Sequence, residues 1–310
     1  MTKSKTLRLA AILAGLVALA LAGGALSGCS DTANSSEGDQ SAGFAKDANT
    51  LVFGVVPDSV DTETNYQPLM DYVAAQTGKK VEYRESTDYA ALIEAAVAGK
   101  IDVASFSGFT YVIAKNRGAA ITPVSSIVTE PGAEPGYYAE AIVPNGSSIA
   151  TLADFKGQRV CFVDPSSTSG YLFPSYELLQ LGIDPEQDVT PVFAGKHDVS
   201  VAKTAEGKEC DAGFAEDSEV AKSSAVTVVS RTHVPGAPMV FSDTLPDSVI
   251  QALKDALTEV TIDDLIAQGI ENADSEAFRS VFAALKPVDD SAYDLIRDIC
   301  QETGAEQCKA

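Results

Sequence analysis

A run of four hydroxyl residues, 166–169, is the segment best suited to chemistry, because it stands between an apolar run and a helix-like stretch. Residues 159–163 predict a strand, and residues 170–181 predict a helix that begins directly after the hydroxyls. A helix N-terminus carries unpaired N–H groups and a partial positive charge, and serine and threonine hydroxyls beside it can donate hydrogen bonds to an oxyanion. One hydroxyl is enough to cap a helix, so the segment is either a hydroxyl-rich cap or a binding site for a tetrahedral anion.

The charge and the motif content narrow the classes of function. With 22 basic and 44 acidic residues, the 310-residue chain has a formal net charge of −22, which argues against binding nucleic acid through neutralised phosphates. A nucleotide-binding phosphate loop is disfavoured, since no Gly-x-x-x-x-Gly-Lys precedes the helix. The sequence also lacks His-Glu-x-x-His and Gly-x-Ser-x-Gly, so an enzyme is the weaker alternative. No cofactor or metal is expected, because His197 and His233 are not spaced with the cysteines as ligands.

The N-terminal residues have the plan of a secretory signal. Residues 1–28 carry three basic residues followed by an apolar run over 9–26. The ending Leu-Ser-Gly before Cys29 resembles the bacterial lipobox, which implies cleavage before Cys29 and lipidation of its thiol. The alternative is an uncleaved signal anchor, since the apolar run is about long enough to span a bilayer. Either form tethers the protein to the cell membrane on its extracytoplasmic face.

Cleavage would leave a 282-residue chain with a formal net charge of −25, because the leader contains three basic residues and no acidic ones. Residues 29–49 are rich in Ser, Asp, Gly and Asn, with almost nothing to bury, and predict a flexible tether. The folded part is expected to begin near Thr50.

Four cysteines remain once Cys29 is assigned to lipid, an even number in an oxidising compartment, which favours two disulfides. Three pairings are possible. Cys161 and Cys210 each lie in a strand-like run, whereas Cys300 and Cys308 are close together near the C-terminus, so we favour Cys161 with Cys210 and Cys300 with Cys308. The alternative is unpaired buried thiols.

From residue 50 onward, short apolar runs alternate with amphipathic stretches, which predicts an α/β protein, and two lobes account for the pattern better than one sheet. The expected strands are residues 51–56, 81–84, 101–106, 121–128, 139–143, 159–163, 189–193, 210–214, 226–230 and 239–241. The expected helices are residues 66–77, 88–98, 111–116, 152–155, 170–181, 197–205, 246–260, 263–268, 275–285 and 291–303.

The segment Asp164-Pro165-Ser166-Ser167-Thr168-Ser169-Gly170 resembles the Asp-Pro-x-Ser-Thr-Ser-Gly signature of periplasmic phosphonate-binding proteins. These proteins are the solute receptors of ABC importers for phosphate, phosphite and phosphonates. The resemblance extends over residues 51–304. Its other landmarks, in order, are Thr87-Asp88-Tyr89, Gly99-Lys100-Ile101-Asp102-Val103-Ala104, Gly136-Tyr137-Tyr138, Ala194-Gly195-Lys196-His197-Asp198, Cys210-Asp211-Ala212-Gly213 and Asp289-Asp290-Ser291-Ala292-Tyr293-Asp294.

The resemblance implies a two-lobed, type 2 periplasmic-binding (Venus flytrap) fold that closes on its ligand by a hinge motion. We expect lobe 1 to comprise residues 50–135 plus 235–310, and lobe 2 to comprise residues 136–234. The loop at residues 131–136 is the expected first crossover between them.

The resemblance also implies a set of ligand-binding residues, which combines the signature hydroxyls with tyrosines, a histidine and an acidic position near residues 216–217. Residues 106–111 depart from the family pattern and are expected to line the mouth of the cleft. The expected ligand-binding residues are Tyr89, Ser107, Tyr137, Ser166, Ser167, Thr168, Ser169, His197 and Asp217.

One departure from the family pattern bears on the choice of ligand. Aminoalkylphosphonate receptors of this family hold the substrate ammonium with carboxylates, one of them between a Gly and a Pro. The matching stretch here is Gly236-Ala237-Pro238, and Ala237 cannot bind an amine. We therefore expect a small phosphorus oxyanion, such as phosphite, phosphate or a simple alkylphosphonate, in preference to 2-aminoethylphosphonate.

The function expected from these observations is that of a monomeric binding lipoprotein that delivers its oxyanion to an ABC permease in the membrane. A surface lipoprotein that senses the ligand and signals to a partner would share the same cleft. An enzyme acting on a phosphonate is the weaker alternative.

Overall fold

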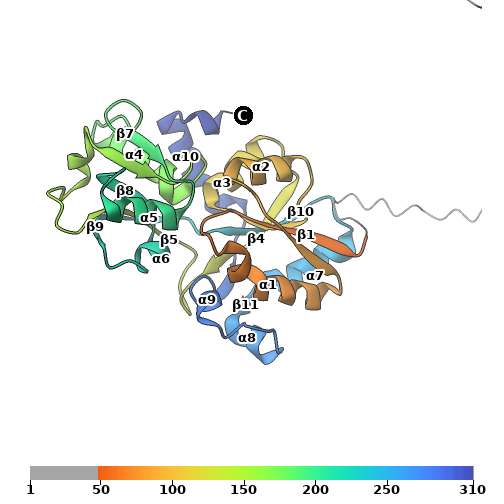
Figure 1. Cartoon of the computed structure of the whole chain (residues 1–310). Helices are drawn as coiled ribbons and strands as arrows, with labels where there is room; N and C mark the ends of the chain where they lie inside the picture. The colour runs from red at the N-terminus through yellow and green to blue at the C-terminus, as the bar shows by residue number, and fades with distance from the viewer. Residues whose placement is uncertain (1–47, 310) are drawn as a thin grey trace, which may run out of the picture. The chain divides into compact units, whose positions relative to one another are not determined.

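The chain folds around two β-sheets, of seven and five strands, in a computed structural model that describes residues 48–309 (Figure 1). The signal segment, Cys29 and all but the last two residues of the expected tether lie outside the described residues. The seven-stranded sheet has the order β11-β12-β4-β10-β3-β1-β2. Its strands are β1 (Thr50–Val55), β2 (Lys80–Arg84), β3 (Val103–Ser105), β4 (Ile121–Val128), β10 (Pro238–Ser242), β11 (Val260–Thr261) and β12 (Ala284–Pro287).

Helices cover both faces of this sheet. Strand β1 has no exposed face, and its alternate residues enter two different cores: Phe53 packs on one side and Val52 on the other. The side reached by Phe53 is covered by helices that include α1 and α7, and the side reached by Val52 by α2 and α3 (Figure 1). The helices of this part are α1 (Thr62–Thr77), α2 (Tyr89–Val97), α3 (Gly108–Asn116), α7 (Asp247–Leu257), α8 (Ile262–Ala267) and α9 (Glu276–Arg279).

The five-stranded sheet has the order β7-β6-β8-β5-β9, and its strands come from one continuous stretch of the chain. The strands are β5 (Tyr137–Pro144), β6 (Arg159–Phe162), β7 (Thr190–Phe193), β8 (Ala212–Glu216) and β9 (Val226–Val234). One face packs against α4 and the other against α5 and α6. The helical segments are η1 (Leu152–Phe155), the π-helical turn η2 (Thr168–Leu172), α4 (Phe173–Gln180), α5 (His197–Glu206) and α6 (Asp217–Val220).

The chain crosses between the sheets twice, from β4 to β5 and from β9 to β10. Glycines occupy both crossings. Gly136 has a φ of +151°, and a Cβ there would lie 2.2 Å from Nε2 of His233. A Cβ on Gly236 would lie 2.9 Å from the backbone nitrogen of Gly136. The two crossings therefore pass so closely that neither position tolerates a side chain.

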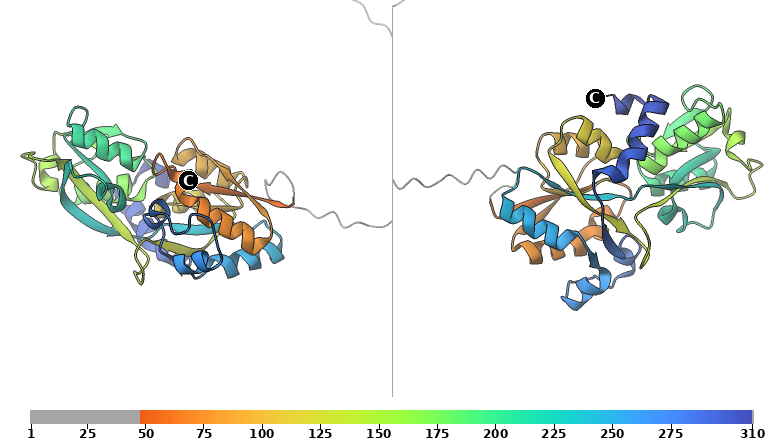
Figure 2. Two further views of the ribbon diagram at one scale, coloured as in Figure 1. Left: turned by 60° about the horizontal axis from the view of Figure 1, so that its bottom comes forward. Right: turned by 180° about the vertical axis from the view of Figure 1, so that it is seen from behind.

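The C-terminal segment joins the two halves from behind (Figure 2). Helix α10 (Asp294–Thr303) packs against α3 and α4. In the sequence it is preceded by the short turn η3 (Asp290–Tyr293) and followed by η4 (Glu306–Cys308). A disulfide from Cys300 to Cys308 ties the last turn to this helix. The second disulfide, Cys161–Cys210, joins β6 to the residue two positions before β8. Both pairings are those expected from the sequence.

The α/β alternation is confirmed, but one expected helix is wrong. Residues 275–285 form only the short helix α9 and then strand β12. Ala284 and Leu285 pair with Val128 and Ile127 of β4, so they extend the sheet. Short apolar runs fit a strand or a helix equally well, and here pairing with an available sheet edge decides the outcome. None of the described helices is long and apolar enough to cross a membrane.

Candidate ligand-binding site

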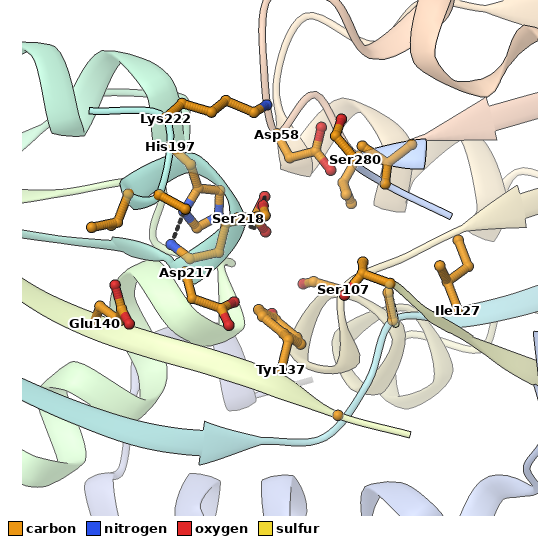
Figure 3. Close-up of a pocket in the computed structure, with 18 of the residues that line it drawn as sticks. Asp58, Ser107, Ile127, Tyr137, Glu140, His197, Asp217, Ser218, Lys222 and Ser280 are labelled. Carbon is orange, nitrogen blue, oxygen red and sulfur yellow. Dashed lines mark hydrogen bonds and ion pairs between the residues drawn. The ribbon is translucent and has the colours of Figure 1, made fainter. Parts of the chain in front are cut away.

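A cavity of about 750 Å³ lies between the two halves of the described chain (Figure 3). This volume is typical of a small-molecule site. Side chains from both sheets converge on it, and Figure 3 shows Asp58 and Ser107 facing His197, Asp217 and Ser218 across the opening. The polar residues that surround its inner part are Asp58, Tyr66, Tyr89, Ser105, Ser107, Tyr137, His197, Glu216, Asp217 and Ser218.

Most of these side chains lie where strands end and helices begin. Ser107 follows β3 and is the N-cap of α3, with its Oγ accepting from the Thr110 N–H at 3.4 Å. Asp88 caps α2 by accepting from the Ala91 N–H at 2.7 Å, which makes Tyr89 the first residue of that helix. Ligands of open α/β sheets bind outside the carboxyl ends of the strands, and local capping here fixes the side chains at those ends.

The signature hydroxyls are buried next to the cavity wall, and they differ in their hydrogen-bond partners. The Ser167 Oγ accepts from the Gly170 N–H at 3.0 Å and caps the π-helical turn. The Thr168 Oγ1 accepts from the Phe109 N–H at 2.8 Å, and the Ser166 carbonyl accepts from the Thr110 hydroxyl at 3.0 Å. Both of these bonds join the two halves of the chain.

Ser169 is the signature residue whose hydroxyl forms no well-aligned hydrogen bond. Its Oγ is fully buried, and the Tyr137 hydroxyl, which lies beside it and beside Thr168, is the group placed to pair with it, without forming a well-aligned hydrogen bond. Tyr137 lines the cavity, so its phenol stands between the signature hydroxyls and the open space. An unsatisfied buried hydroxyl costs free energy, and an incoming oxyanion could accept its hydrogen bond.

His197 is held as a neutral hydrogen-bond donor. Its Nδ1 accepts from the Glu216 N–H at 2.9 Å, so Nδ1 carries no proton and Nε2 does. Burial lowers the pKa of His197 to about 4, which keeps the ring uncharged near neutral pH. The His197 backbone N–H also donates to the Asp58 carbonyl at 2.9 Å, across the cleft.

Two half-buried carboxyls, one from each half of the chain, line the same cavity. Burial raises the pKa of Asp58 to about 7, and the negative charge of Glu216 adds to the shift. Burial likewise raises the pKa of Glu216 to about 7. The Asp58 Oδ1 accepts from the Thr62 hydroxyl at 2.8 Å, and the Glu216 Oε1 accepts from the Ser218 hydroxyl at 2.7 Å.

The basic side chains on the described cavity wall are already engaged. Arg231 contacts Glu140 and Asp217, each at 3.1 Å, and lies over the Tyr138 ring. Lys222 pairs with Glu219 at 2.6 Å. The remaining one, Arg279, donates through Nε to the backbone carbonyl of Asp274 at 3.2 Å. An anion in the cavity would therefore be bound mainly by neutral donors.

The structure brings Tyr89, Ser107, Tyr137, His197 and Asp217 together on the cavity wall. Residues 166–169 are buried and do not line the cavity, although Thr168 and Ser169 lie beside the Tyr137 phenol. The carboxylate of Asp217 is occupied by Arg231 and the Tyr138 N–H, whereas its neighbour Glu216 lies next to His197.

Sequence reasoning missed several of the polar lining residues, among them Asp58, Tyr66 and Ser105. Asp58 follows the end of β1, and the hydroxyls of Tyr66 and Ser105 lie 3.3 Å apart on the same wall. The position of Asp58 three residues after the end of a buried strand was the available signal. No cluster of three or more His, Cys, Asp or Glu suited to a metal occurs within residues 48–309.

Two α/β lobes with a polar cavity between them define this protein as a solute-binding protein of the periplasmic type. A family model described as "ABC transporter, phosphonate, periplasmic substrate-binding protein" matches residues 53–293. The chain belongs to this family.

Known relatives agree with that assignment. The chain is 34% identical over 282 residues to the phosphate-import protein PhnD of Mycolicibacterium smegmatis, covering 84% of this chain and 88% of that protein. The structure is similar to the binding protein component of an ABC phosphonate transporter from Pseudomonas aeruginosa, with a TM-score of 0.71 and 22% identity, covering 83% of this chain and 87% of that one. It is also similar to PhnD1 of Prochlorococcus marinus in complex with methylphosphonate, with a TM-score of 0.71 and 18% identity, covering 84% of this chain and all of that one. The two structural similarities establish the two-lobed fold.

Because Ser167 and Ser169 differ in their hydrogen bonds, we expect removal of one hydroxyl to change stability and removal of the other to change ligand affinity. We expect Ser169→Ala to weaken phosphate binding by about tenfold or more while changing stability little, because this hydroxyl forms no well-aligned hydrogen bond within the protein and has only the Tyr137 phenol beside it. We expect Ser167→Ala to lower the free energy of unfolding by about 1 kcal/mol, because it removes a helix cap. Calorimetric titration with phosphate and urea unfolding measure the two effects. An unchanged affinity in Ser169→Ala would place the ligand elsewhere.

The buried carboxyls predict that stability depends on pH. Folded Asp58 keeps its proton up to about pH 7, whereas the ordinary pKa of an aspartate in an unfolded chain is 3.8. The stability that this carboxyl contributes is therefore full below about pH 4 and is lost as pH rises to 7. Asp58→Asn should raise the free energy of unfolding of the unliganded protein by about 1–3 kcal/mol at pH 8, and the gain should shrink toward pH 4.5.

Urea unfolding at pH 8, 6 and 4.5 measures this difference, and Asp61→Asn is the matched control. Asp61 is three residues away, is exposed and makes no side-chain cap. His197 has the opposite sign, since its folded pKa is lowered from 6.5 to about 4, and it also responds to the charge of Asp58. The comparison at pH 8 and pH 6 is therefore the decisive one, because the folded ring is neutral there in all three proteins. A gain in Asp58→Asn that is the same at every pH would contradict the explanation.

Proposed function

We propose that this chain captures a small phosphorus oxyanion, either phosphite, phosphate or a simple alkylphosphonate, and delivers it to the permease of an ABC importer. The observation that carries the proposal is the cavity between the lobes, where phenols, hydroxyls and the neutral ring of His197 converge. Neutral donors can bind an anion without a basic residue. That arrangement suits a chain with a net charge of −22.

Two observations favour a ligand without an amine. Ala237 lines the cavity at the position where aminoalkylphosphonate receptors have a carboxylate. The relative that is 34% identical is named a phosphate-import protein. We therefore place phosphate and its amine-free analogues ahead of 2-aminoethylphosphonate.

The site proposal includes the signature residues together with the cavity wall. Tyr89, Tyr137 and His197 would donate directly to the oxyanion. Entry of the ligand would displace the Tyr137 phenol from the hydroxyls behind it, which would open Thr168 and Ser169 to the ligand. Ser107, at the N-terminus of α3, would contribute from the first lobe.

The two lobes would close around the ligand as rigid units. We assign residues 50–135 plus 235–310 to lobe 1 and residues 136–234 to lobe 2. The hinge would then lie at the two crossings, where Gly136 and Gly236 approach each other. A few residues at such crossings can absorb the change in backbone angles that closure requires.

The protein would act as a monomer, anchored by lipid on Cys29 to the extracytoplasmic face of the cell membrane. Its lipobox-like residues and the extracytoplasmic character of its family support this placement. Residues 30–49 would then give the folded part enough reach to meet its permease.

Calorimetric titration of the full chain in detergent with phosphate, phosphite, methylphosphonate and 2-aminoethylphosphonate tests the ligand class. We expect one of the three amine-free oxyanions to bind most tightly, because Ala237 offers no partner for an ammonium group. Preference for 2-aminoethylphosphonate would contradict the assignment of Ala237. Absence of binding to all four would contradict the proposed function.

The anchor is tested by growing cells that express the protein with labelled palmitate. We expect label on the wild-type chain and none on Cys29→Ala, because the thiol is the acceptor of the lipid. Cys161→Ala, which removes a cysteine of a disulfide, is the control and should stay labelled. An unlabelled wild-type chain with an intact leader would instead support the signal anchor.

A further inference from the structure

Asp58 is a cavity residue whose carboxylate has no basic partner. Among the described residues, no lysine or arginine forms an ion pair with it; its Oδ1 accepts from the Thr62 hydroxyl, and its second oxygen is left for another donor. Figure 3 shows this carboxylate pointing into the opening between the lobes. Its main chain is fixed by the bond from the His197 N–H, so the side chain stands beside the donors expected to hold the oxyanion.

The groups around Asp58 do not compensate its charge. From the second lobe it faces the carboxylates of Glu216 and Glu219 and the neutral ring of His197. From the first lobe, the phenols of Tyr66 and Tyr89 lie close enough to Asp58 for its charge to raise their pKa. An ionised carboxylate accepts hydrogen bonds and donates none. Next to a bound oxyanion it is favourable only where a proton lies between the two oxygens.

We infer that Asp58 is a specificity-determining residue, which accepts a hydrogen bond from a P–OH group of the ligand and thereby makes the site selective for phosphate. The inference rests on the proposed function and narrows its ligand class. The carboxyl does not touch a reacting atom; it decides which tetrahedral anions fit the cavity electrostatically.

Acid–base chemistry separates the candidate ligands. Phosphate retains one hydroxyl well into the alkaline range, whereas phosphite and methylphosphonate lose their last acidic proton near neutral pH. Sulfate has no proton at either pH. At pH 6 a proton is available from the ligand or from Asp58 itself, because the pKa of this carboxyl is raised to about 7. At pH 8.5, phosphate is the one anion of the four that still carries an acidic proton.

The test is calorimetric titration of the full-length protein in detergent with phosphate, phosphite, methylphosphonate and sulfate at pH 6 and pH 8.5. In the wild type we expect phosphate affinity to exceed sulfate affinity by about ten- to a hundredfold at pH 8.5, the effect of one hydrogen bond to a charged group. Phosphite and methylphosphonate should lose about tenfold relative to phosphate between pH 6 and pH 8.5.

Asp58→Asn is the decisive variant. An asparagine keeps the oxygen that accepts from Thr62 and replaces the other oxygen with an amide that donates to an anion. We expect the advantage of phosphate over sulfate at pH 8.5 to shrink to less than about threefold, and the pH-dependent loss of phosphite to disappear. Asp61→Asn removes the same charge outside this cavity and should behave as the wild type.

Three outcomes would overturn the inference. An unchanged ratio of phosphate to sulfate affinity in Asp58→Asn at pH 8.5 would show that Asp58 does not select the ligand. An equal change in Asp61→Asn would show a general effect of charge. Failure of the wild type to bind any phosphorus oxyanion at pH 6 would instead refute the proposed function, and the inference with it. If Asp58→Asn does not fold, the pH-dependent ratios of the wild type decide the question alone.

Discussion

The need to hold an anion inside a strongly acidic protein constrains the whole arrangement of the site. The chain has a net charge of −22, and the arginines and lysine on the cavity wall are engaged with carboxylates or a backbone carbonyl. Long-range attraction is therefore unavailable, and affinity has to come from short hydrogen bonds inside the cavity, where the lower local dielectric makes each bond stronger than in bulk solvent. Such bonds require accurately placed donors. The affinity of the site therefore depends on the helix caps that position the donors and on the hydrogen bond that fixes the tautomer of His197.

The fold provides this placement by using strand ends and helix starts as fixed points. Asp88 sets Tyr89 at the first turn of α2, and the Ser107 cap sets the first turn of α3. The Glu216 N–H fixes which nitrogen of His197 carries the proton, and burial keeps that ring neutral. These are local interactions, each within one lobe. The ligand can therefore meet pre-oriented donors from both lobes in the same cavity.

Much of this was predictable from the sequence, and the failures have physical causes. The order of strands and helices follows from local periodicity, and the signature residues 164–170 identify the family because their sequence is unusual. The helix expected over residues 275–285 failed because pairing of Ala284 with β4 is a long-range event that local pattern does not encode. Asp58 was missed for a related reason: among 44 acidic residues, a carboxylate becomes distinctive only when folding buries it opposite another. The sequence placed an acidic position near residues 216–217, whereas the structure pairs Asp217 with Arg231 and sets Glu216 beside His197.

The position of the two carboxyls on opposite lobes connects ligand chemistry to lobe closure. The lobes are held together beside Asp58 by bonds from the His197 N–H to the Asp58 carbonyl and from the Lys196 Nζ to the Ser59 carbonyl, the latter at 3.1 Å. Asp58 and Glu216 line the same cavity, and two ionised carboxylates in surroundings of low dielectric repel each other. A ligand that supplies a proton at this point reduces the repulsion, whereas a fully deprotonated anion adds to it. A ligand can shift a conformational equilibrium only by its difference in affinity for the two states, and the proton on the oxyanion supplies such a difference. Selection of the ligand and closure on it would then depend on the same contact.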